Sequence, residues 1–140
     1  MIAAALLLPI LPIAAQGQVG PFVVETRSFR EESYPRVGML RSVTSLQWKS
    51  PSGLTTYSLS DDGEYVVVSF RVDGEGGWCR SNPDPIRLTA RPSVRFEIDC
   101  KLLGARKAKL LAGEMRAARP YFRAAYASFY EATLRQHGPL

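Results

Sequence analysis

Hydrophobic and polar residues alternate most strictly in two stretches of the chain, Glu64–Val72 and Ser93–Cys100. One side of the first stretch carries only the apolar residues Val66, Val68, Phe70 and Val72. One side of the second carries Val94, Phe96 and Ile98, followed by Cys100. Successive side chains leave a strand on opposite faces, so this alternation predicts two half-buried antiparallel strands.

Short turns connect the other strand candidates. Ser50–Gly53 has the composition of a turn and separates Ser42–Lys49 from Leu54–Leu59. A second turn, Ser60–Gly63, leads into the first alternating stretch, and Phe22–Phe29 is the earliest strand candidate. Because consecutive strands joined by short turns pair as antiparallel neighbours, we expect a β-meander of about four to five strands.

After Cys100 the hydrophobic period changes to that of a helix. Pro120 interrupts the pattern, either as the first residue of a second helix or as a kink in one long helix. Both alternatives place a helical layer on one face of the sheet, which predicts an α+β fold. The residues on the apolar side are Leu103, Leu110, Leu111, Met115, Ala118, Phe122, Ala125, Tyr126, Phe129 and Thr133.

The start of the chain differs from the rest. Residues 2–15 are almost wholly apolar, and Ala15–Gly17 has the small-x-small form of a signal-peptidase site. The run is too short, and too broken by Pro9 and Pro12, for a membrane span of about 20 residues. We therefore predict a signal peptide over residues 1–17 and a single α+β domain over residues 18–140, with strands within 22–100 and helices within 102–136. No Lys or Arg precedes the apolar run, and the alternative is a buried N-terminal strand.

The cysteine content agrees with export to the periplasm or the medium. An oxidising compartment favours a disulfide between Cys79 and Cys100, the two cysteines of the chain, which would contribute roughly 3 kcal/mol. A structural zinc needs about four ligands, and the one histidine, His137, lies near the end of the chain. The acidic turn at Asp61 and Asp62 does not have calcium-loop spacing. No metal or cofactor is expected.

A long connection rich in Gly and Pro, Asp73–Pro92, separates the two alternating stretches. Connections of this length are often functional. Trp78 and Arg80 flank Cys79 and could present an aromatic ring and a guanidinium group to a ligand. The alternative is that Trp78 packs on the sheet edge beside the disulfide.

Positive charge is concentrated in the helical part. Residues 1–100 contain 10 basic and 11 acidic side chains, whereas residues 101–140 contain 8 basic and 2 acidic ones. If the helix continues across Pro120, four basic residues share a face turned away from the apolar stripe: Lys109, Arg116, Arg119 and Arg123. Such a face is either simply solvated or an anion-binding ridge, since guanidinium offers a planar fork of donors.

Signals for catalysis are weak. The chain has no Gly-x-Ser-x-Gly, His-Glu-x-x-His or phosphate-loop motif, and Glu97 and Asp99 share their strand face with Arg95 like an ordinary exposed face. These patterns favour a small exported binding or accessory protein that contacts an anionic envelope component or an acidic partner, and not nucleic acid, through its basic helical face. Two alternatives remain open: an inhibitor or structural partner protein, and a small hydrolase that uses carboxylates.

Overall fold

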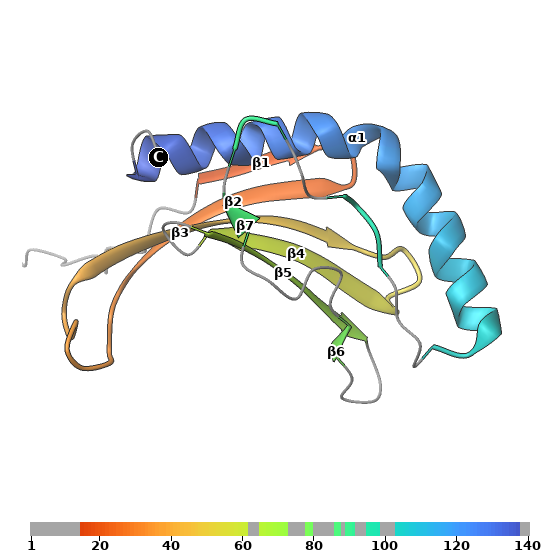
Figure 1. Cartoon of the computed structure of the whole chain (residues 1–140), viewed down its shortest axis with the longest axis horizontal. Coiled ribbons are helices and arrows are strands. Elements are labelled where there is room, and N and C mark those ends of the chain that lie inside the picture. The colour runs from red at the N-terminus through yellow and green to blue at the C-terminus, as the bar shows by residue number, and fades with distance from the viewer. Residues whose placement is uncertain are drawn as a thin grey trace, which may run out of the picture.

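An antiparallel sheet covered on one face by a long helix forms the body of the protein (Figure 1). The structure is a computed structural model, and it describes residues 15–61, 65–72, 78–79, 86–87, 89–91, 95–98 and 103–137. The elements, in chain order, are β1 (Ala15–Val19), β2 (Phe22–Arg30), β3 (Leu40–Lys49), β4 (Thr55–Asp61), β5 (Tyr65–Val72), β6 (Trp78–Cys79), β7 (Ile86–Arg87) and α1 (Ala105–His137). The predicted α+β fold is confirmed.

The sheet is a meander in which strands adjacent in sequence are also adjacent in space. The order is β1-β2-β3-β4-β5-β6, with every pairing antiparallel, and β7 also pairs with β5. The four strands β2 to β5 lie where the alternation and the turn residues place them, each within two residues of the predicted bounds. The local turn signals at Ser50–Gly53 and Ser60–Gly63 therefore predicted the neighbour relations of β3, β4 and β5, whereas the longer connection between β2 and β3 carried no such signal.

The strand predicted over Ser93–Cys100 is wrong where the structure describes that stretch, because residues 95–98 form no strand. Phe96 is nevertheless 2% exposed, and its neighbours Arg95 and Glu97 are exposed. The backbone N–H of Glu97 donates a hydrogen bond of 3.0 Å to the carbonyl of Arg95, so the chain turns at Phe96, whose side chain enters the core while its two neighbours stay outside. Along β5, the pairing positions at Tyr65, Val66, Phe70 and Arg71 are taken by β6 and β7.

Strand β1 begins inside the predicted signal peptide. It pairs with β2, and its register sets Ala15 opposite Thr26 and Gly17 opposite Val24. The predicted cleavage site, Ala15–Gly17, thus forms part of the sheet edge. Residues 1–14 lie outside the described part of the chain, and the export signal stays a prediction.

Helix α1 is continuous through Pro120, which decides between the two predicted alternatives in favour of one long helix. Figure 1 shows that α1 is bent, so that its two halves follow different directions over the sheet. Proline lacks the N–H group and crowds the carbonyl group of the preceding turn, which is the usual cause of such a bend. No described helix is long and apolar enough to cross a membrane.

The core lies between α1 and the helix-facing side of the sheet. Register places the buried residues in rows across the strands, with Phe22 beside Trp48 and Trp48 beside Tyr57. A second apolar row consists of Val24, Leu46 and Leu59. Beyond it lies a polar row, in which the buried hydroxyl groups of Thr26 and Thr44 are 3.0 Å apart and hydrogen-bonded. From α1 the core receives Leu111, Met115, Ala118, Phe122, Ala125, Tyr126, Phe129 and Ala132. The placement of Leu110 on this apolar side was wrong, because Leu110 is 51% exposed.

A candidate anion-binding groove

Phe96 fixes the segment 95–98 against the body of the protein. Its ring centroid lies 5.1 Å from those of Phe22 and Trp48 and 4.9 Å from that of Tyr57, all with edge-to-face geometry. On the helix side it stacks on Phe122 at 5.6 Å. Aromatic pairs in these geometries contribute about 0.5–1.5 kcal/mol each beyond the burial of their area. Phe96 therefore holds its exposed neighbours in sequence at the flank of α1.

A second anchor holds the segment 89–91. The hydroxyl group of Tyr126 donates a hydrogen bond of 3.2 Å to the backbone carbonyl of Thr89, and the Thr89 hydroxyl donates one of 2.6 Å to the carbonyl of Arg91. Burial raises the pKa of Tyr126 above its ordinary value of about 10. The phenol is therefore protonated, and a donor, throughout the neutral and mildly alkaline range. Thr89 therefore links Arg91 to Tyr126 of α1.

These two segments and α1 enclose a groove with two adjoining parts, called the arginine groove below. The larger part, of about 730 Å³, is lined by Arg91, Arg95, Phe96, Glu97, Arg119, Phe122 and Arg123. The smaller part, of about 430 Å³, shares Glu97 and Arg119 with it and adds Arg116. Its remaining described lining is apolar: Ile98, Leu103, Ala108, Leu111, Ala112 and Met115.

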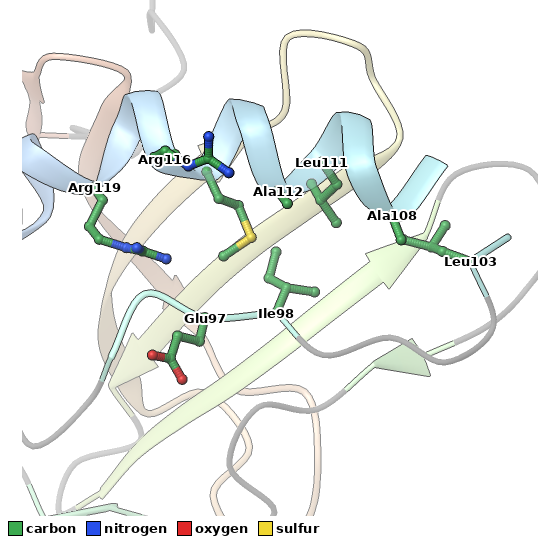
Figure 2. A pocket seen from close by; sticks show the side chains of 9 residues that line it. Glu97, Ile98, Leu103, Ala108, Leu111, Ala112, Arg116 and Arg119 are labelled. Carbon is green, nitrogen blue, oxygen red and sulfur yellow. The ribbon is translucent and has the colours of Figure 1, made fainter. Parts of the chain in front are cut away.

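The described lining of the arginine groove is strongly positive. It contains five arginines and a single carboxylate, that of Glu97. Figure 2 shows Arg119 reaching from α1 toward the segment that carries Glu97 and Ile98, while the Glu97 carboxyl group points away from α1. Within the described ranges, no ion pair joins any of these arginines to an acid. Their guanidinium groups are free to hold a phosphate, sulfate or carboxylate group.

The structure gathers three of the four residues of the predicted basic ridge. Arg116, Arg119 and Arg123 line the arginine groove, whereas Lys109 lines a separate open depression of about 1060 Å³ between α1 and the β3–β4 turn. There the backbone N–H and the hydroxyl group of Ser52 each donate a hydrogen bond of 3.0 Å to the carboxylate of Glu114. These two bonds tie the first half of α1 to the turn.

Sequence reasoning missed Arg91 and Arg95 as members of the site. The alternating pattern predicts Arg95 on an exposed strand face with Glu97, and Arg91 lies in the long connection between the two alternating stretches. A helical pattern finds residues that share a face of one helix, but it carries no information about which other segment packs beside that face. One signal for Arg95 was available in the sequence. The alternation of apolar and polar residues around Phe96 places Arg95 next to a buried residue, and therefore at the rim of the core.

The predicted loop contact and disulfide involve residues that the structure describes only in part. Trp78 and Cys79 form β6 and pair with Arg71 and Phe70 of β5. Their side chains, and the whole of Arg80 and Cys100, lie outside the described residues. The disulfide and the role of this loop stay predictions.

No group of three or more His, Cys, Asp or Glu residues that could hold a metal ion occurs among the described residues. Comparisons with models of protein families, with characterised proteins and with solved structures find no match for this chain. The chemistry of the arginine groove therefore carries the functional argument.

Proposed function

We propose that this chain is a small exported binding protein that holds an anionic component of the cell envelope, or an acidic group of a partner, in the arginine groove. One observation carries the proposal: Arg91 and Arg95, from the connection that precedes α1, line the same cavity as Arg119 and Arg123 of the helix. Like charges gathered around one cavity repel each other, and a bound anion removes that cost. If the basic face of α1 were only solvated, there would be no reason for arginines of a second segment to lie beside it.

The form of the groove favours an anion that has an apolar portion. Phe96 and Phe122 lie among the arginines in the larger part, and Ile98 and Met115 lie in the smaller part. Guanidinium forks bind the oxygens of a phosphate or carboxylate, and apolar walls accept hydrocarbon. A lipid headgroup with part of its chain has both properties.

The described lining supports binding better than hydrolysis. A glycosidase-type hydrolase uses a pair of carboxyl groups about 5–10 Å apart. Glu97 is the one carboxylate among the described lining residues, and Asp99, its predicted neighbour, lies outside the described ranges. The proposal is therefore a binding function.

The test compares two double variants with the same change in charge on the same helix. Arg119→Glu with Arg123→Glu reverses two charges in the groove, and Arg106→Glu with Lys109→Glu reverses two charges outside it. The probes are 8-anilinonaphthalene-1-sulfonate, followed by fluorescence, and short-chain phosphatidylglycerol as a competitor. We expect the groove variant to bind the sulfonate at least about tenfold more weakly and the control variant to bind it nearly as well as the wild type.

Folding of both variants is checked by thermal unfolding, because substitutions on an exposed face usually change stability by less than about 0.5 kcal/mol. Binding should also weaken with added salt, since exposed charges are screened over about 8 Å at physiological ionic strength. An equal loss of binding in the two variants would show that net charge, and not the groove, attracts the probe. That result would refute the proposed function.

Export is the second part of the proposal, and it is supported by the apolar residues 2–15 and by the small residues at Ala15–Gly17. Expressed with access to the export machinery, the protein should lose roughly its first 15 to 17 residues. It should then also contain no reactive thiol under denaturing, non-reducing conditions. Mass spectrometry and thiol labelling measure both, and an intact N-terminus would contradict this part.

A further inference from the structure

Apolar side chains gather at the end of the β2–β3 hairpin, far from the arginine groove in sequence. Tyr34 is 91% exposed, Leu40 69%, Val37 63% and Met39 60%. Together with Phe29 they make up five of the seven large exposed hydrophobic residues in the described part of the chain. These five residues are called the hairpin tip below. Exposed apolar side chains gathered in one place mark a contact surface, whereas single scattered ones are ordinary.

The hairpin tip is held in its form by hydrogen bonds within the loop. The backbone N–H of Glu31 donates to the carbonyl of Met39 at 2.9 Å, and the N–H of Gly38 donates to the carbonyl of Glu31 at 2.7 Å. The guanidinium group of Arg30 donates to the carbonyl of Gly38 at 2.9 Å, and Arg41 forms an ion pair of 2.8 Å with Glu31. The loop therefore has a defined structure that keeps its apolar side chains in water.

Arginines surround these apolar side chains. Residues 25–41 contain four arginines and three glutamates, so this stretch carries a net charge of +1. Arg27 and Arg41 are ion-paired with Glu25 and Glu31, whereas Arg30 and Arg36 form no ion pair with the described acids and carry the excess positive charge. Figure 1 shows that the end of the β2–β3 hairpin projects away from α1 as a narrow tip. A protruding apolar tip with a tyrosine, surrounded by arginines, matches a lipid–water interface, where the tip enters the acyl boundary and the guanidinium groups remain among anionic headgroups.

We propose that the hairpin tip docks the protein on the surface of an anionic lipid bilayer. The occupant is a membrane and not an apolar groove of another protein, because net positive charge accompanies the apolar residues and anionic headgroups complement it. This docking surface uses none of the residues that line the arginine groove. The docking proposal can therefore be tested independently of the proposed function.

The first experiment places a fluorescent reporter at the hairpin tip. Tyr34→Trp introduces an indole at the most exposed apolar position, and Tyr121→Trp, at a residue of α1 that is 48% exposed, is the matched control. With vesicles of phosphatidylcholine and phosphatidylglycerol, the added emission at position 34 should shift to the blue and be quenched by brominated lipid. The added emission at position 121 should not change. An unchanged spectrum at position 34 would overturn the proposal.

The second experiment measures flotation with the same vesicles. The variant Val37→Ser, Met39→Ser and Leu40→Ser should bind at least about tenfold more weakly, whereas Leu110→Ser, at another exposed apolar position, should bind as the wild type does. Arg36→Glu should weaken binding to these vesicles, and vesicles of phosphatidylcholine alone should bind the wild type poorly. Equal binding to both kinds of vesicle would overturn the anionic specificity.

Two further results would assign the hairpin tip differently. If the triple serine variant still floats and the Arg119→Glu, Arg123→Glu variant does not, the arginine groove holds the vesicle and the hairpin proposal fails. If the wild type forms oligomers in sedimentation without lipid and the triple serine variant does not, the tip contacts a second copy of the chain, and the proposal is again overturned. Loss of sulfonate binding in the groove variant with normal flotation supports both proposals separately.

Discussion

Replacing Phe96 by alanine tests whether the segment 95–98 is a structural part of the core. Phe96 is 2% exposed and contacts four aromatic rings, those of Phe22, Trp48, Tyr57 and Phe122, at centroid distances of 4.9 to 5.6 Å. Truncating a fully buried phenylalanine costs about 3–5 kcal/mol, since transfer energy is lost and a cavity remains. A loss of about 4 kcal/mol lowers the folding equilibrium constant roughly a thousandfold, a large share of the about 5–15 kcal/mol typical of a domain.

Urea unfolding gives the free energy lost and thermal unfolding gives the midpoint temperature, both followed by circular dichroism. Glu97→Ala, on the adjacent exposed residue, is the matched control. We expect the midpoint temperature of Phe96→Ala to fall by about 10–15 °C and that of Glu97→Ala to change little. If the free energy of unfolding of Phe96→Ala falls by less than about 1 kcal/mol, the core packs without a contribution from this segment. The arginine groove would then lack its fixed wall, and the argument for the site would fail with it.

Two other predictions concern the turn before β2 and the ionisation of a buried phenol. Gly20 has φ +54°, and an added Cβ would lie 2.5 Å from the Tyr121 ring, so Gly20→Ala should cost about 1–3 kcal/mol in urea unfolding. Adding Tyr121→Ala should recover only the steric part, and complete recovery would contradict the backbone argument. Burial raises the pKa of the Tyr57 phenol in the folded state. The contribution of this group to folding stability is therefore complete below the unfolded pKa of about 10. It is lost as the pH rises further, at about 1.4 kcal/mol per pH unit. Tyr57→Phe should remove that part of the alkaline slope, and an identical slope in the variant would refute the assignment.

The meander was predictable because its signals are local. Ser50–Gly53 and Ser60–Gly63 fix short connections, and short connections leave only antiparallel neighbours. The apolar side of the helix was predictable for the same reason, since Leu111, Phe122 and Phe129 follow a period that belongs to one element. The continuity of α1 at Pro120 was left open because proline fits both a first turn and a kink.

The remainder depends on contacts between elements. Alternation around Phe96 correctly indicated which side chain is buried, but it could not show whether a neighbouring strand supplies hydrogen bonds. The four-residue basic ridge was similarly incomplete, because Lys109 lies beside the β3–β4 turn and Arg91 and Arg95 come from another segment. Packing between distant segments decides such a site, and one sequence contains no direct record of that packing.

The pairing of β1 with β2 and the proposed signal peptide assign the residues before Gln18 two roles that exclude each other in one molecule. Removal of the proposed signal peptide after Gly17 would detach Ala15–Gly17 from β2, and the facing backbone of Val24, Glu25 and Thr26 would lose its neighbours. An open strand edge is a template for pairing with another chain. Proteolytic maturation would then do more than release the protein from its leader: it would shorten β1 and move the open edge of the sheet from Ala15–Gly17 to the facing part of β2.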